Sequence, residues 1–204
     1  MLAKVPALLI AFRFALAPAL YLDTRDGQVG VWFLALVALG FLSDLFDGVI
    51  ARRTGGVTAR LREWDGRTDV WFVAWLAAGA WNTRPDLVVD HGTPLLLVVA
   101  VQALAWVVDL AKYRRFSNYH TYTAKAWGWS IAVLALVWFG GGDVALPLWA
   151  AVALGTACCL EEIAITLVLP EWTHDVPSVV HAVRRERRPL TPERQAVPTP
   201  RPEP

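Results

Sequence analysis

Four aspartates between residues 44 and 69 are the side chains of this sequence best suited to chemistry. Asp44 and Asp47 are three positions apart, and Asp65 and Asp69 are four positions apart. On helices each pair lies on one face, so two neighbouring helices could bring both pairs to one pocket. Grouped carboxylates repel one another and are costly to desolvate near a membrane, whereas hard divalent cations such as Mg²⁺ prefer oxygen ligands and relieve that cost. The spacing therefore predicts a divalent-metal site.

Arginines alternate with these carboxylates along the chain. They are Arg52, Arg53, Arg60, Arg62 and Arg67. A guanidinium group is planar and binds phosphate oxygens through two parallel hydrogen bonds. Carboxylates, cations and arginines in one stretch indicate phosphoryl-type chemistry on a phosphorylated substrate.

The elements that must position these residues are apolar. The chain has 204 residues, of which 56% are hydrophobic, a composition typical of a membrane protein. Six apolar segments are each close to the ~20 residues that cross a bilayer as a helix. They are residues 5–22, 30–50, 68–82, 94–112, 124–140 and 145–169. We therefore expect an all-α integral membrane protein, in which six transmembrane helices surround a cytoplasm-facing polar pocket and are joined by short cytoplasmic elements.

Basic residues are concentrated on one side of these predicted spans. With both termini in the cytoplasm, the segments on that side contain sixteen lysines and arginines, and those on the other side contain only Arg25 and Arg84. Because cytoplasmic loops carry an excess of Lys and Arg, the asymmetry predicts a multi-pass protein of the cell (inner, cytoplasmic) membrane. Both termini and the stretch 44–69 are then expected at its cytoplasmic face.

The connection between the second and third spans carries the two aspartate pairs. Thr54-Gly55-Gly56 predicts a break in the helix, and residues 57–64 are expected to form a short cytoplasmic element. Asp65 and Asp69 then open the third span, where carboxylates could also act only as caps that suit the helix dipole. Because the first aspartate pair precedes them at the spacing described above, we favour the metal site over capping.

The order and spacing of these residues resemble the signature of a known enzyme family. Asp44-x2-Asp47-Gly48-x2-Ala51-Arg52, then twelve residues and Asp65-x3-Asp69, resembles the motif of the CDP-alcohol phosphatidyltransferases. These are class-I CDP-alcohol phosphotransferases, and the chain is most similar to the kind that includes phosphatidylglycerophosphate synthases. It departs from the pattern at one position, because the family usually has a glycine close to the nucleotide where this chain has Leu61.

The resemblance implies a role for each matched residue. The implied metal ligands are Asp44, Asp47, Asp65 and Asp69, which would hold Mg²⁺ or Mn²⁺, as two ions. Asp69 is also implied as the catalytic base that activates the acceptor hydroxyl. The implied nucleotide- and diphosphate-binding residues are Gly48, Ala51, Arg52 and Asp44.

The same resemblance implies transfer of a phosphatidyl group from CDP-diacylglycerol to an alcohol, with release of CMP, in phospholipid synthesis. The implied partners are these two substrates, membrane lipids and a second copy of the chain in a homodimer, and no nucleic acid. The acceptor stays open: it could be glycerol 3-phosphate or another phosphorylated polyol, or free serine, inositol or choline. A CDP-headgroup donor, a catalytically silent lipid- or nucleotide-binding relative, and a metal-ion transporter are alternatives. Transport is disfavoured because the acids gather at one face of the membrane.

Three cations outside the motif are candidate ligands for the acceptor: Arg13, Lys112 and Lys125. Arg13 lies in the middle of the first span, in a stretch that resembles the first helix of the family. It could hold substrate phosphate, orient an acidic ligand or form a structural ion pair. Lys112 and Lys125 flank a basic, aromatic loop and could hold an acceptor phosphate or only follow the positive-inside bias. In that loop, His120 is expected to be a hydrogen-bonding surface residue.

The rest of the chain divides by composition. We expect a six-helix catalytic domain over residues 1–170, a basic juxtamembrane segment over 171–188 and a Pro-rich disordered tail over 189–204. Glu161 and Glu162 lie within the last span, where a buried acid needs a partner. Structural pairing with Arg13 or with a loop lysine is the expected role of these two residues.

Overall fold

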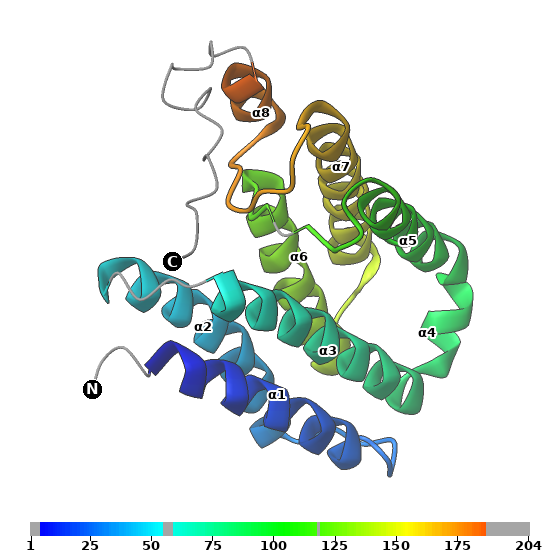
Figure 1. The fold of residues 1–204 in the computed structure, drawn as a ribbon. Helices are drawn as coiled ribbons and strands as arrows, with labels where there is room; N and C mark the ends of the chain where they lie inside the picture. The colour runs from blue at the N-terminus through cyan, green and yellow to red at the C-terminus, as the bar shows by residue number, and fades with distance from the viewer. Residues whose placement is uncertain (1–4, 55–58, 118, 187–204) are drawn as a thin grey trace.

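The computed structural model describes residues 5–54, 59–117 and 119–186, without the side chains of residues 45, 47–54, 59, 60 and 62. Every regular element in these ranges is an α-helix (Figure 1), which confirms the all-α prediction. The helices are α1 (Val5–Asp23), α2 (Val31–Thr54), α3 (Ala59–Thr83), α4 (Pro85–Asp90), α5 (Gly92–Tyr113), α6 (Tyr122–Phe139), α7 (Ala145–Val168) and α8 (Val179–Glu186). The tail predicted over residues 189–204 lies outside the described residues.

The six longer helices occupy the positions of the six predicted spans. Three of them, α1, α5 and α7, are long and apolar enough to cross a membrane. The apolar part of α2, Val31–Asp44, is shorter. Large apolar side chains point outward, including Trp32 at 84% and Leu146 at 81% exposure. Such surfaces indicate an apolar environment and a membrane protein, while the count of six spans stays a prediction.

The start of α3 differs from the prediction. Residues 57–64 were expected to form a separate short element, but α3 begins at Ala59 and continues without a break through both of its aspartates to Thr83. The residues of its first turns are mostly good helix formers, and an ion pair of 2.7 Å joins Glu63 to Arg67 one turn later. The two aspartates therefore lie inside a helix, so capping of a helix N-terminus does not explain them.

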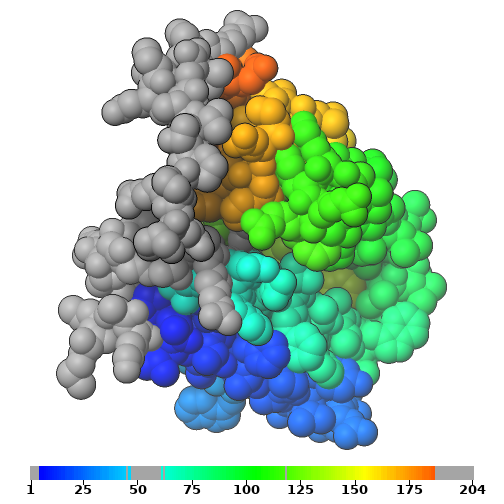
Figure 2. Space-filling view, viewed as in Figure 1, coloured from blue at the N-terminus to red at the C-terminus, as the bar shows by residue number. Residues whose placement is uncertain are grey.

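The helices form two groups (Figure 1). In the α1–α3 group, α1 packs against both α2 and α3. In the α5–α8 group, α7 packs against α5, α6 and α8. Helix α6 joins the groups by contacting α2 and α3, and the short α4 leads from α3 to α5. In Figure 2 the first group forms the lower part of the surface and the second group the upper part.

The apolar core crosses the boundary between the two groups. Its buried members include Leu20 from α1, Phe33 from α2, Phe72 from α3, Trp138 from α6 and Leu148 from α7. A second buried cluster joins the end of α7 to α8 and consists of Tyr119, Ile165, Leu169, Val176 and Ala182. The helices that carry the predicted site are thus fixed against the rest of the protein by apolar burial.

Candidate active site

Three of the four predicted metal ligands lie together in the structure. Asp44 comes from α2, and Asp65 and Asp69 come from successive turns of α3. Carboxylate oxygens of the three residues lie within 4.8 Å of one another. The spacing of four residues on α3 brings Asp65 and Asp69 to one face, as the sequence predicts. We call Asp44, Asp65 and Asp69 the aspartate cluster.

The remaining predicted residues of the motif lie on the turns of α2 that follow Asp44. They are Asp47, Gly48, Ala51 and Arg52, and their side chains are outside the described ones. Leu61, which stands where the family has glycine, lies in the first turns of α3 and is partly buried. The part these residues play in nucleotide binding therefore stays a prediction.

The guanidinium of Arg13 lies among the three carboxylates. Its Nη1 atom is 2.8 Å from Oδ1 of Asp44, and its Nη2 atom is 2.8 Å from Oδ1 of both Asp65 and Asp69. The side chain of Arg13 is 2% exposed and that of Asp65 is 11% exposed, whereas those of Asp44 and Asp69 are 48% and 43% exposed. The arginine thus binds the carboxylates from the interior of the protein.

Aromatic contacts hold α1 against α3 beside this cluster. The rings of Phe14 and Trp71 are stacked, with centroids 5.0 Å apart and an angle of 11° between their planes. The indole Nε1 of Trp71 also donates to the carbonyl oxygen of Phe14 at 3.1 Å. Phe14 follows Arg13 and Trp71 lies two positions after Asp69, so this contact keeps the guanidinium within reach of the carboxylates.

The ring of Phe72 on α3 lies against the backbone of α2 one turn before Asp44. At this level of α2, a Cβ added to Gly40 would overlap the ring of Phe72, which is itself 2% exposed. The hydroxyl of Ser43 donates to the carbonyl of Gly40 at 2.7 Å and is satisfied inside the helix. Because glycine has no Cβ, the Phe72 ring of α3 can pack against the α2 backbone at this level, one turn from Asp44.

The aspartate cluster has the chemistry of a site for a hard cation. Its donor atoms are all carboxylate oxygens, the ligands that Mg²⁺ and Mn²⁺ prefer. The exposed faces of Asp44 and Asp69 can be reached by an ion from solution. The residues present therefore fit the predicted divalent cation, and the number of ions stays a prediction.

The loop between α5 and α6 brings a further residue towards the cluster. His120 interacts electrostatically with Asp44, is half-buried and has a left-handed backbone with φ of 52°. The residues on either side hold it there: the hydroxyl of Tyr119 is 2.8 Å from that of Thr166, and Thr121 caps the N-terminus of α6. Burial raises the pKa of Tyr119 above its usual value, so this phenol stays protonated. The sequence predicted only a surface histidine, because it does not reveal that both neighbours are buried anchors.

The two lysines predicted to bind the acceptor have partners within the protein. The ammonium of Lys112 donates to the carbonyls of Thr166 and Leu167 at 2.8 and 2.9 Å, in the last turn of α7, where carbonyls lack helical partners. The ammonium of Lys125 lies 5.5 Å from the centroid of the Tyr122 ring. These contacts give Lys112 a structural part, and acceptor binding by either lysine stays a prediction.

Glu161 caps a helix, a role that the sequence did not predict. Its Oε1 accepts from the backbone N–H of Val179 at 3.2 Å, at the start of α8, and its Oε2 accepts from the hydroxyl of Thr123. A carboxylate at a helix N-terminus satisfies an N–H without a helical partner and suits the dipole. Arg13, one of the partners expected for Glu161 or Glu162, pairs with the aspartates instead.

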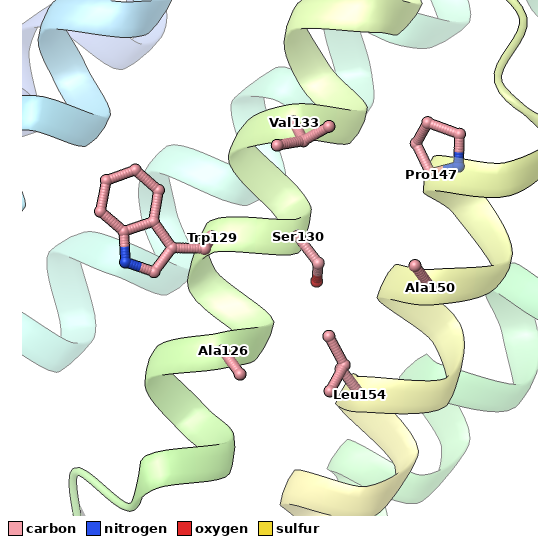
Figure 3. Close-up of a pocket in the computed structure, with 7 residues that line it drawn as sticks. All are labelled: Ala126, Trp129, Ser130, Val133, Pro147, Ala150 and Leu154. Carbon is pink, nitrogen blue, oxygen red and sulfur yellow. The ribbon is translucent and has the colours of Figure 1, made fainter.

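A groove lies elsewhere on the protein, between α6 and α7 (Figure 3). Its volume is about 330 Å³, and its lining residues are Ala126, Trp129, Ser130, Val133, Pro147, Ala150 and Leu154. The lining is almost entirely apolar and contains none of the predicted site residues. This groove is therefore not the predicted polar pocket, which stays a prediction.

Comparison with known proteins identifies the motif. The model of the CDP-alcohol phosphatidyltransferase family matches residues 3–180, which include every described residue of the aspartate cluster together with Arg13. No curated protein and no solved structure gives a significant match to the chain.

Proposed function

The chain belongs to the CDP-alcohol phosphatidyltransferase family, whose members are enzymes that transfer substituted phosphate groups, and we propose that this enzyme makes a phospholipid. In this proposal, CDP-diacylglycerol donates a phosphatidyl group to an alcohol and CMP is released. We propose that residues 1–170 form the catalytic domain; the family match covers residues 3–180 and so continues ten residues beyond that boundary.

The observation that carries the proposal is the meeting of Asp44, Asp65 and Asp69 from two helices, with oxygens within 4.8 Å of one another. These three residues are separated along the chain by the spacing of the family motif. A CDP-linked lipid carries a diphosphate, which must be neutralised before a hydroxyl can approach it. Carboxylates that hold divalent cations meet this need, because the bound cations supply the positive charge that stabilises the diphosphate and the departing phosphate.

The exposure of the two α3 aspartates supports different roles for them. Asp65, with 11% of its side chain exposed, suits a ligand fixed in the protein, whereas Asp69, with 43% exposed, can meet a substrate hydroxyl. We assign Asp69 as the base that takes the proton of the acceptor hydroxyl. The hydroxyl oxygen then forms a bond to the phosphorus of the phosphatidyl group, and the bond from that phosphorus to the CMP oxygen breaks.

The remaining roles follow the motif. Asp44, Asp47, Asp65 and Asp69 are the proposed ligands of Mg²⁺ or Mn²⁺, as two ions, and Arg52 is proposed to stabilise the charge of the departing CMP. Gly48 and Ala51 are proposed to leave space on α2 for the nucleotide.

The apolar exterior of the helices supports a membrane-embedded reaction. Side chains such as Leu96 and Leu167, which are 69% and 63% exposed, can contact lipid while the acyl chains of the donor stay in the bilayer. We propose that the aspartate cluster faces the cytoplasm of the cell, in the inner membrane, and that the enzyme is a homodimer. Glycerol 3-phosphate or another phosphorylated polyol is the proposed acceptor, to which Lys112 and Lys125 would contribute positive charge.

The test is an assay of CMP release by the purified protein with CDP-diacylglycerol and Mg²⁺ or Mn²⁺. Alcohols are offered singly: glycerol 3-phosphate, inositol phosphate, inositol, serine and choline. The expected result is CMP release that requires both a metal ion and one acceptor. Asp69→Asn should abolish it, and Asp90→Asn, an exposed aspartate at the end of α4, should not.

Two results would change the proposal. If CMP is released only when a CDP-headgroup such as CDP-choline is offered with diacylglycerol as acceptor, the donor is the CDP-headgroup and not CDP-diacylglycerol. Absence of CMP with every pair of substrates, from a folded protein that binds metal, would indicate a silent relative. In that case Leu61→Gly, which restores the residue usual in the family, would show whether the leucine is the cause.

A further inference from the structure

Arg13 is the only cation in the described residues whose ion pairs join α1 to both α2 and α3, and its contacts are to the three members of the aspartate cluster. We infer that Arg13 is a positioning residue, a counter-ion built into the protein that holds the carboxylates together on their buried side and leaves their exposed side for a divalent cation. The inference rests on the proposed metal-binding function of the cluster.

The distribution of exposure around the cluster supports two separate faces. Arg13 reaches the carboxylates from α1, where its side chain is 2% exposed. Asp44 and Asp69 are each close to half exposed, although both bind the guanidinium through Oδ1. Because close to half of each of these side chains faces the solvent, the two residues can meet a metal ion on that side while they keep the arginine on the other side.

The charge of the cluster supports the same inference. Three carboxylates and one guanidinium leave two net negative charges on the aspartate cluster, so the arginine lowers the repulsion among the carboxylates and the cluster still attracts divalent cations. Without Arg13, three carboxylates would face one another with a dry interior behind them, and their repulsion would destabilise the metal-free protein. With Arg13, the metal-free protein can keep the carboxylates together until an ion arrives.

Direct binding of an acceptor phosphate by Arg13 fits the geometry less well. Both terminal nitrogens of the guanidinium already have carboxylate partners at 2.8 Å. A phosphate would have to displace these partners and enter a region where the arginine side chain is 2% exposed. Arg13 therefore acts on substrate only through the carboxylates that it positions.

The test compares wild-type protein with Arg13→Gln and Arg13→Lys by two measurements that do not depend on activity. The first is the thermal unfolding midpoint with EDTA and with Mg²⁺, and the second is the affinity for Mn²⁺ alone, measured by electron paramagnetic resonance. In EDTA, Arg13→Gln should lower the midpoint by about 10 °C, because a partner of buried charges is lost, and Mg²⁺ should recover most of that loss. Removal of the positive charge beside the site should also tighten Mn²⁺ binding about tenfold.

Arg13→Lys should keep Mn²⁺ affinity close to that of the wild type, because it keeps the charge, and should recover only part of the midpoint in EDTA, because an ammonium lacks the two nitrogens that reach Asp44 and the α3 aspartates separately. Arg67→Gln is the matched control: Arg67 lies on α3 between the two aspartates of that helix, but its side chain is 58% exposed and pairs with Glu63. This variant should show no greater dependence on Mg²⁺ than the wild type. Unchanged or weaker Mn²⁺ binding by Arg13→Gln would overturn the inference, as would a fall in midpoint that Mg²⁺ does not recover.

A charge-balanced double variant covers the case in which Arg13→Gln does not fold. Arg13→Gln with Asp69→Asn removes one charge of each sign, so it should recover folded protein in EDTA if Arg13 acts as a counter-ion. A double variant as unstable as the single one would contradict the inference.

If the wild type itself binds no Mn²⁺, the proposed metal site fails, and the inference fails with it. If the wild type binds Mn²⁺ but substitution of Arg13 changes neither the midpoint nor the Mn²⁺ affinity, the inference fails and the proposed metal site stands.

Discussion

The protein holds two groups of buried or half-buried carboxylates, and it satisfies them in different ways. In the α1–α3 group, Asp44, Asp65 and Asp69 share one guanidinium, and Asp44 and Asp69 are close to half exposed. In the α5–α8 group, Asp109 accepts from the hydroxyl of Thr166 at 2.7 Å and from a loop N–H at 2.8 Å. In the first group the carboxylates of Asp44 and Asp69 keep solvent-exposed surface, whereas in the second group each oxygen of Asp109 accepts a hydrogen bond from a neutral donor.

Glu161, like Asp109, accepts hydrogen bonds from neutral donors. Its two oxygens accept from a hydroxyl of α6 and from the first N–H of α8, so the carboxylate joins three helices. An acidic residue within an apolar helix can have a binding role or a structural role, and the comparison shows that its hydrogen-bond and ion-pair partners, rather than its position, distinguish the two. The same substitutions made in both groups test this difference.

The largest effect is expected from Asp69→Asn in the aspartate cluster. Loss of the proposed base should reduce CMP formation about 10³-fold, while nucleotide binding that depends on the metal is largely kept. The measurements are initial rates of CMP release and equilibrium binding of a CDP-lipid in Mg²⁺. Equal loss of catalysis and binding would argue that Asp69 is mainly a metal ligand, which would weaken its distinction from Asp65.

The same substitution at Asp109, Asp109→Asn, should act on stability. The new side chain would place an amide N–H₂ against one of the two hydrogen-bond donors. The free energy of unfolding should therefore fall by about 2 kcal/mol. Activity for each folded molecule should stay near that of the wild type. Thermal unfolding in detergent and CMP release from the folded fraction measure the two effects. A large loss of activity without loss of stability would break the comparison, because Asp109 would then belong to the active site.

Gly40→Ala tests the packing of Phe72 against α2, one turn before Asp44. The new methyl group overlaps the buried Phe72 ring, so α2 and α3 must separate or the ring must move. Overpacking of this kind should cost about 1–3 kcal/mol, and it should weaken Mn²⁺ binding because the carboxylates move apart. Gly128→Ala on α6, where an added Cβ meets no atom within 4 Å, is the control. Loss of stability without any change in metal affinity would show that Gly40 serves packing alone.

The smallest effect is expected from Glu63→Gln, which breaks the exposed pair with Arg67 on α3. Both side chains are more than half exposed, and such pairs contribute about 0.5 kcal/mol or less. Unfolding and CMP release should be almost unchanged. A loss comparable with that of Arg13→Gln would show that net charge near the cluster, rather than burial of the guanidinium, controls the site.

Much of the α1–α3 group could be predicted from the sequence. The apolar segments predict the long helices to within a few residues at most ends, and the interval of four residues predicts that Asp65 and Asp69 share a face. The sequence predicts the start of α3 too late, because its charged residues indicate a separate cytoplasmic element over 57–64, although Glu63 and Arg67 form a helical pair. Family membership also followed from the motif, since it depends on local spacing.

The partners of the charged residues could not be predicted in the same way. Arg13 and Asp65 are 52 positions apart, and their contact depends on the rotation of α1 about its axis and on the Phe14–Trp71 stack. Glu161 lies 18 positions from the N–H that it caps. Neither distance leaves a periodic signal, so the sequence left open whether Arg13 meets a substrate or an acid.

The buried ion pairs of Arg13 have a consequence for the synthesis of the protein. Helix α1 carries a positive charge in the middle of an apolar segment, and such a segment enters a bilayer alone only at considerable cost. The carboxylates that offset this charge follow within the next two helices, and all three helices are complete at Thr83, before α5 has been made. We therefore expect α1, α2 and α3 to enter the membrane as one cooperative unit during translation, so that charge neutralisation within the nascent chain, rather than the hydrophobicity of α1 alone, determines whether the first helix is inserted.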